Sequence, residues 1–309
     1  MRVSSKEFGF VALAGLGLAL ATSIPYVLGH LLPFPDSRFN GNLVFDIDMN
    51  AHFAYARQSA TGHWLFYNPM TPEPHAPVFF NLEWLLLGKL AAVMGGSVEL
   101  AFQIVRIAWI FVLCFAVYWL SSFLFDTIVM RRIVFAAIML GGGFGWVLQI
   151  PGLGGFLPSR LFLDTSAAIH PFFWMLLAPH SLIAGSLALL TLCFFLRAEA
   201  GGGKRDYFLA ATACFLAGAM RPYEMLHLVV AISLYLLVVV VWKRDAGSVS
   251  RHVLRSLIIC VSIPLFIYYV WLLEFHDVFR WWGAQNVLST RCAVLGHLFD
   301  EYWAQRKAA

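Results

Sequence analysis

Long apolar runs separated by short polar segments dominate the pattern along this chain. Most runs are close to the roughly 20 residues that a helix needs to cross the hydrocarbon of a bilayer. Backbone groups in lipid must be satisfied within the span, so these runs predict helices and not the short alternating strands of an outer-membrane barrel. The pattern predicts about seven transmembrane helices, at 8–32, 98–124, 133–150, 171–196, 207–222, 225–242 and 256–274.

A further apolar stretch, from Val78 to Met94, is interrupted by Asn81, Glu83 and Lys89. Polar side chains at such positions are typical of a helix that lies at the membrane interface or re-enters it. We therefore expect interfacial helices in a large first extracytoplasmic loop, and we do not count this stretch as a span.

The first run follows Arg2 and Lys6, which is typical of a signal anchor whose N-terminus is cytoplasmic. Ala19-Leu20-Ala21 resembles a signal-peptidase site, but the apolar run continues past it to Leu32, so we expect the segment to be retained. Alternating passage then places 131–132, 197–206 and 243–255 in the cytoplasm. Lys and Arg exceed acids in these segments and acids exceed Lys and Arg outside, as the positive-inside rule requires.

Composition narrows the class further, because 61% of the 309 residues are hydrophobic and only 12% are charged. Mean hydropathy is +0.76. A water-soluble globule needs more polar surface than this, and disordered, collagen-like and disulfide-framework proteins have other compositions. The sequence therefore predicts an all-α polytopic membrane protein of the plasma (inner) membrane, with the lipid bilayer as a partner and no nucleic-acid partner.

Polar residues gather in the loop that follows the first span. From Asp48 onward the segment reads as a short helix, since neither Gly nor Pro interrupts it before Gly62. Asp48, His52 and Tyr55 then share one face, with Arg57 round the side. Such a face has a base, a metal ligand and a hydrogen-bond donor, but a solvated interfacial helix with an acid near its start accounts for it equally well.

A Pro-rich turn, Glu73-Pro74-His75-Ala-Pro77, follows an aromatic segment that contains Gly62-His63-Trp64 and Tyr67-Asn68-Pro69. An aromatic belt at the headgroup level is one interpretation of this segment. A metal or phosphate contact by Glu73 and His75 is another, although two ligands are too few to define a site.

A second polar group is predicted on the same side of the membrane. It comprises Arg160, Asp164, His170 and His180 around the fourth span, and Arg221, Glu224 and His227 in the next pair. Charges in an apolar bundle are costly, so they line a cavity or pair with one another. Arg221 and Glu224, at i and i+3, fit such a pair equally well, and His180 fits a packed core histidine.

Taken in order, these residues resemble the amino-terminal module of the GT-C glycosyltransferases. The likeness rests on an Asp-containing helix after the first span, Gly-x-Trp, aromatic-Asn-Pro, a Pro-rich turn, a Trp-bearing helix with Gly88, and a span that opens near Arg106. Arg221-Pro-Tyr-Glu224 is similar to a His-Pro-Tyr/Phe-Asp element of some bacterial members. The resemblance covers roughly residues 8–280, and protein O-mannosyltransferases and lipid A aminoarabinose transferases belong to this superfamily.

The resemblance implies an inverting transfer of a sugar from a polyprenyl-phosphate donor to an extracytoplasmic lipid, glycan or protein acceptor. Asp48, with Asp46 close by, takes the place of the family's acidic motif, which acts as a base or helps hold a divalent cation (Mg, Mn or Zn). Arg160 or Arg221 would bind the donor phosphate, because guanidinium matches phosphate in a bidentate way. The implied metal ligands are Asp48, Glu73 and His75, and the implied supporting side chains are His52, Arg57, Glu73, His75, His170 and Glu224.

This organisation predicts four segments: a signal-anchor helix over 1–32, an extracytoplasmic loop over 33–97, a bundle over 98–274 and an extracytoplasmic tail over 275–309. The tail lacks the further spans that the resemblance implies, so we expect a truncated or frameshifted copy of a family member, or a catalytic half that lacks a domain. Two other classes stay open. One is a transporter or channel subunit, with Arg106, Arg221, Glu224 and His227 lining its pathway, and the other is an inactive scaffold.

Overall fold

The computed structural model describes residues 3–33, 36–43, 46–141, 170–177, 179–239 and 249–280, and only the backbone at 46–48, 179 and 249–250. Their regular secondary structure is helical, apart from one isolated bridge between Phe66 and Phe79, and loops connect the helices. The helices are α1 (Ser5–Leu31), α2 (Asp46–Ala60), α3 (Leu82–Val93), α4 (Val98–Leu124), α5 (Ile128–Leu140), α6 (Pro171–Leu177), α7 (Pro179–Glu199), α8 (Lys204–Met220), α9 (Pro222–Leu237), α10 (Val249–Cys260) and α11 (Ile263–Phe275).

Within the described ranges, four helical segments are long and apolar enough to cross a bilayer: Ser5–Leu31, Val98–Leu124, His180–Glu199 and Arg251–Phe275. Large apolar side chains stay exposed along α1, including Leu13 at 71% and Leu20 at 62%. Such a surface is favourable against lipid and unfavourable against water. The chain is therefore a helical multi-pass membrane protein, which confirms the class that composition predicts.

The remaining predicted spans correspond to shorter helices or to parts of the chain that are not described. The predicted spans at 207–222 and 225–242 overlap α8 and α9, which have 17 and 16 residues. The one at 133–150 overlaps α5, which ends at Leu140. The number of seven spans thus stays a prediction.

Prolines explain where two predicted spans are divided. The run at 171–196 contains the end of α6 at Leu177 and the start of α7 at Pro179. The run at 256–274 contains the end of α10 and the start of α11, which has Pro264 in its first turn. Proline lacks the N–H that would continue a preceding helix, but it is well tolerated in the first turn of a new one.

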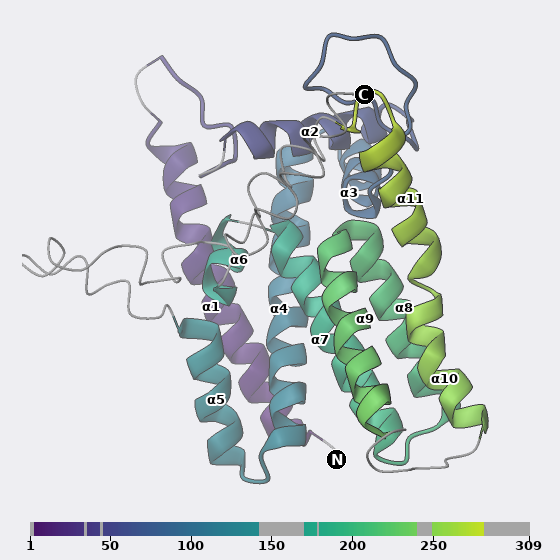
Figure 1. Ribbon diagram of the computed structural model, residues 1–309. Helices are drawn as coiled ribbons and strands as arrows, with labels where there is room; N and C mark the ends of the chain where they lie inside the picture. The colour runs from purple at the N-terminus through teal and green to yellow at the C-terminus, as the bar shows by residue number, and fades with distance from the viewer. Residues whose placement is uncertain are drawn as a thin grey trace, which may run out of the picture.

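The helices form a bundle that is closed at one end by α2 and α3. Figure 1 shows α4, α7, α8 and α9 side by side, with α1 and α5 on one flank and α10 and α11 on the other. Helix α2 lies across one end of the bundle, which we call the α2 end. The N-terminus and the turns α4–α5 and α7–α8 lie at the opposite end, which we call the N-terminal end (Figure 1).

Close contact between α2 and α3 depends on a glycine. A Cβ atom at Gly88 would lie 2.2 Å from the carbonyl oxygen of Ala56 and 2.4 Å from the Cβ of Ser59. The Ser59 hydroxyl donates to the carbonyl of Leu85 (2.7 Å), and the Lys89 ammonium donates to the carbonyl of Ser59 (3.0 Å). The two helices of the predicted loop are therefore packed together as one unit on α4 and α11.

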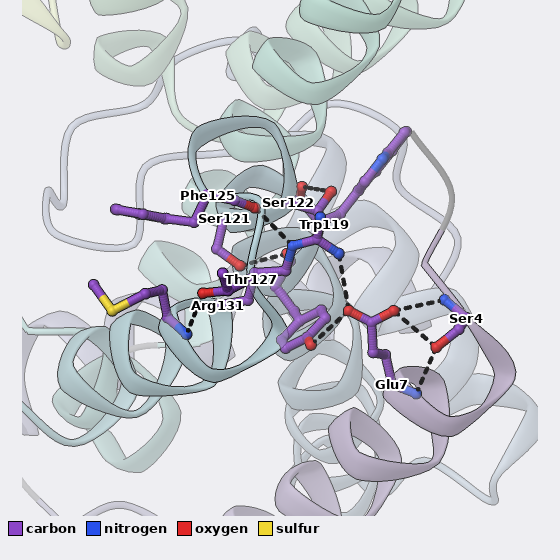
Figure 2. A network of polar contacts seen from close by, with 10 residues as sticks. Ser4, Glu7, Trp119, Ser121, Ser122, Phe125, Thr127 and Arg131 are labelled. Atoms are coloured by element: carbon purple, nitrogen blue, oxygen red, sulfur yellow. Dashed lines mark hydrogen bonds and ion pairs between the residues drawn. The ribbon is translucent and has the colours of Figure 1, made fainter.

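A buried carboxylate, Glu7, and a half-buried one, Glu199, connect the helices at the N-terminal end. Glu7 accepts hydrogen bonds from the Ser4 N–H and hydroxyl, from the Tyr118 hydroxyl and from Arg131 (Figure 2). Glu199 accepts from Arg255 and from the hydroxyls of two tyrosines, Tyr207 and Tyr235. Each carboxylate is thus paired with a cation, which lowers the cost of burying either charge.

Arg106 lies inside the bundle and is fully buried. Its guanidinium donates to the hydroxyls of Thr22 and Ser23, to the side chain of Gln103 and to the carbonyl of Met175. The cation therefore connects α1, α4 and the short helix α6.

Candidate functional site

A cavity of about 740 Å³ opens at the α2 end of the bundle. Its walls come from α2, the loop before α3, the start of α7, the α8–α9 junction and α11. Four of the side chains that line it are able to bind a polar or charged ligand: His52, Glu73, His180 and Arg221. Functional pockets typically have volumes of about 300–1,000 Å³ and a few convergent polar groups, so this cavity is the candidate site.

The α8–α9 junction places Arg221 in the cavity wall. Arg221 has extended backbone (φ −144°, ψ 99°) between the two helices, and Pro222 opens α9. Its Nη1 donates to the Ser181 hydroxyl at 2.8 Å and lies 3.5 Å from a carboxylate oxygen of Glu224. The side chain is 26% exposed, so the guanidinium is positioned but still accessible to an anionic ligand.

Two histidines and a tryptophan meet in the wall of the cavity. The His52 ring stacks on Trp84, with centroids 4.3 Å apart and planes at 19°. His180 meets His52 edge-on, at 5.2 Å and 70°. The Nδ1 atoms of His52 and His180 are buried and have no hydrogen-bond partner among the described residues. Burial lowers the pKa of His52 to about 4, so this imidazole is neutral at physiological pH.

Glu83 is a buried carboxyl near the same wall, in the first turn of α3. It is 5% exposed, and its Oε2 has no hydrogen-bond partner among the described residues. Burial raises the pKa of Glu83 to about 8, and the positive charge of Arg221 opposes this effect only in part. The group is thus mainly protonated at neutral pH, so Glu83 adds no second negative charge beside Arg221, which already pairs with Glu224.

The structure brings together several side chains that the sequence suggested. His52 and Glu73, from the segment between α1 and α4, line the same cavity as Arg221. Glu224 pairs with Arg221, as the i, i+3 spacing predicts. Arg221 therefore both forms an ion pair and lines the cavity. His180 is half-buried, with a buried Nδ1, as a packed histidine would be, yet it also lines the cavity.

Other predicted residues lie elsewhere or outside the described parts of the chain. Arg57 is exposed on α2, and His170 is buried just before α6, and neither lines the cavity. Asp46 and Asp48 occupy the first turn of α2, but their side chains are not among the described atoms. Arg160 lies in the stretch 142–169, outside the described residues.

Of the three implied metal ligands, Glu73 and His75 lie among the described side chains, and Asp48 does not. The Nε2 of His75 accepts the N–H of Asn68 at 2.8 Å, and its Nδ1 lies 2.8 Å from the carbonyl oxygen of Glu73. Both ring nitrogens of His75 are therefore engaged by main-chain groups of the loop. Among the described residues no three His, Cys, Asp or Glu side chains converge as ligands.

Sequence reasoning assigned no functional role to Asn81, Glu83 and Trp84. All three lie at the start of α3, within the apolar stretch that was predicted to be interfacial. The signal was present, because an Asn and a Glu interrupt an otherwise apolar run. The apolar run could not show that α7 and α8 lie against these side chains.

No protein-family model matches the chain, and no curated protein or solved structure is detectably similar to it. The proposed function therefore depends on the chemistry of the cavity.

Proposed function

We propose that this protein is a membrane glycosyltransferase that moves a sugar from a polyprenyl-phosphate donor to an acceptor by inverting single displacement. The observation that supports it most is the cavity at the α2 end, where an accessible Arg221 is combined with polar side chains of the segment between α1 and α4. A lipid-linked substrate requires such a site, because its prenyl chain must stay in the bilayer while its phosphate meets a cation.

In the proposed reaction, the acceptor hydroxyl or amine attacks the anomeric carbon of the donor sugar. Asp48, one turn before the cavity residue His52 on α2, takes the acceptor proton. The bond between the anomeric carbon and the phosphate oxygen breaks, and its electron pair leaves with the phosphate. Arg221 stabilises the charge on this leaving group. A positioned base typically contributes about 10²–10⁴-fold to the rate.

We also propose that the α2 end faces the extracytoplasmic side and that the chain crosses the membrane seven times. In support, many Lys and Arg side chains lie at the N-terminal end. They come from the start of α1, the start of α5, the α7–α8 turn and the start of α10. These residues are Lys6, Arg131, Arg132, Arg197, Lys204, Arg205, Arg251 and Arg255. Lys and Arg concentrate on the cytoplasmic side of membrane proteins.

Labelling of single cysteines with a membrane-impermeant maleimide tests this orientation. The natural cysteines are first replaced by serine or alanine. Met70→Cys, in an exposed loop at the α2 end, should be labelled in intact cells. Arg205→Cys, exposed at the N-terminal end, should be labelled only after lysis. The reverse result would contradict the proposed orientation.

The environment of the buried cation Arg106 does not support the transporter alternative. A transport pathway places its polar groups near the bilayer midplane. Arg106 is 0% exposed and is bound by four side-chain or main-chain oxygens, so it does not line an open pathway. The accessible polar groups instead gather at one end of the bundle.

Transfer assays test the proposed activity. Membranes that contain the protein are incubated with radiolabelled polyprenyl-phosphate hexose and pentose, and label in lipid, glycan and protein fractions is measured. We expect Asp48→Asn to lower transfer by about 10²-fold or more, and Arg221→Gln to lower it by about tenfold or more. Arg205→Gln, the same change at the N-terminal end, should leave transfer unchanged. Full activity of D48N and R221Q with normal insertion would refute the mechanism.

A further inference from the structure

The proposed reaction leaves two imidazoles of the cavity without a role. His52 and His180 both line the cavity, and each has a buried Nδ1 without a partner among the described residues. We propose that these two imidazoles form a subsite that binds the hydroxyl groups of a sugar. This inference rests on the proposed function, because it names the part of the cavity that recognises the sugar of the donor.

The geometry holds the two rings in fixed positions. Trp84 is 3% exposed and stacks on His52 at 4.3 Å, which sets the plane of that ring. His180 stands edge-on to His52 and lies 6.4 Å from Trp84. Three aromatic groups thus support one another, so both imidazole rings are held in fixed positions before a ligand arrives.

The chemistry of the two nitrogens favours hydroxyl groups as ligands. A neutral imidazole has one donor and one acceptor nitrogen, and a buried nitrogen without a partner is costly. A hydroxyl both donates and accepts, so it satisfies either tautomer of each ring. Two adjacent imidazoles therefore match a ligand that carries several hydroxyls. A cation matches them less well, since no third ligating side chain converges on them among the described residues.

The subsite is connected directly to the cation that binds phosphate in the proposed reaction. His180 is followed in the chain by Ser181, whose hydroxyl accepts a 2.8 Å hydrogen bond from Arg221. The first turn of α7 therefore contains His180, which belongs to the sugar subsite, and Ser181, which contacts the arginine that binds phosphate. Because the two subsites are neighbours, the cavity fits a ligand in which the sugar is attached directly to the phosphate.

Binding measurements on the 309-residue chain in lipid nanodiscs test this division. The probes are polyprenyl phosphate, polyprenyl-phosphate hexose and octyl hexoside, which contain phosphate alone, both groups and sugar alone. The double variant His52→Phe/His180→Phe keeps the aromatic rings but removes the ring nitrogens. We expect it to bind both hexose-containing probes about tenfold or more weakly, because two hydrogen bonds are lost. Its affinity for polyprenyl phosphate should be unchanged.

Two controls separate the sugar subsite from general damage. His63→Phe removes an exposed imidazole in the α2–α3 loop, outside the cavity, and should bind all probes as the parent does. Arg221→Gln should weaken the two phosphate-containing probes and leave octyl hexoside unchanged. Unaltered thermal unfolding of the double variant shows that its fold is retained, and the single variants His52→Phe and His180→Phe replace it if it is not.

The outcomes distinguish this proposal from the proposed function. Unchanged hexose affinity in H52F/H180F, or in both single variants, would overturn the sugar subsite even if sugar transfer is observed. Hexose binding that is lost with a chelator and restored by Zn²⁺ would show that the histidines hold a cation, which also overturns it. Histidine-dependent binding of octyl hexoside without any binding of polyprenyl phosphate would support the subsite and refute the donor that we propose.

Discussion

The side-chain amide of Asn81 donates a 2.7 Å hydrogen bond to the main-chain carbonyl of Met220, which ties the start of α3 to the end of α8. The Oδ1 of the same side chain accepts the N–H groups of Glu83 and Trp84 and so caps α3. Arg221 follows Met220 directly. One asparagine therefore sets the position of the α3 wall relative to the cation of the cavity.

Replacement of this asparagine should loosen both connections. We expect Asn81→Ala to lower the free energy of unfolding by about 2 kcal/mol, through loss of the helix cap and of a buried hydrogen bond. Asn81→Ser keeps a capping oxygen but is too short to reach Met220, so it should lose only about half as much. Thermal or denaturant unfolding in detergent measures both. An N81A protein as stable as the parent would contradict this role.

The contact between α2 and α3 at Gly88 should tolerate no side chain. A Cβ atom there would clash with main-chain and side-chain atoms of α2. We expect Gly88→Ala to destabilise the protein by about 1–3 kcal/mol, because helix backbones cannot separate without loss of packing.

The matched control is Gly17→Ala in α1, where an added Cβ meets no atom within 4 Å. That variant should be as stable as the parent or slightly more stable, since alanine is the better helix former. Equal behaviour of the two variants in thermal unfolding would show that the α2–α3 contact does not depend on Gly88.

Glu83 should make stability dependent on pH. Its pKa is raised by burial from 4.5 to about 8 in the folded protein, so the folded state holds a proton that the unfolded state releases between these values. The stabilisation is complete below pH 4.5 and is lost as the pH rises towards 8, with a slope of at most about 1.4 kcal/mol per pH unit.

Glu83→Gln should remove this slope, because an amide does not titrate. Denaturant unfolding in detergent at a series of pH values between 5 and 8 measures it. Glu274→Gln, an exposed carboxylate in the last turn of α11, should keep the slope of the parent. A slope that persists in E83Q would assign the pH dependence to another group.

The ion pair of Glu7 with Arg131 should contribute strongly to the N-terminal end of the bundle. The Nη1 of Arg131 lies 3.0 Å from the Oε1 of Glu7 (Figure 2). The side chain of Glu7 is 4% exposed and that of Arg131 is 11% exposed. We expect Glu7→Gln to cost about 3–5 kcal/mol, because it leaves the guanidinium buried without its counter-charge.

A double-mutant cycle with Arg131→Met isolates this pair. The variant E7Q/R131M should be more stable than E7Q alone, since removal of the second charge relieves its burial. Additive losses in chemical unfolding would mean that the two side chains do not interact energetically.

The sequence predicted some parts of the cavity because their signals are local. The helix after Asp46, the stop before Gly62 and the pairing of Arg221 with Glu224 all follow from short-range spacing. The roles of Glu83 and Trp84 were missed because their neighbours come from distant parts of the chain. The fixed loop position of His75 was also missed, since its partners are main-chain atoms that no side-chain motif records.

By itself, the sequence determined that this is a helical membrane protein, because lipid accepts only segments that satisfy their own backbone. The runs at 171–196 and 256–274 were each predicted as one span, and only the structure showed that new helices begin at Pro179 and just before Pro264. Only the tertiary structure decided which polar side chains meet. Asn81 and Met220 are 139 residues apart, and His52 and His180 come from different helices. Such encounters depend on how each helix is rotated and packed against the others, which no local pattern specifies.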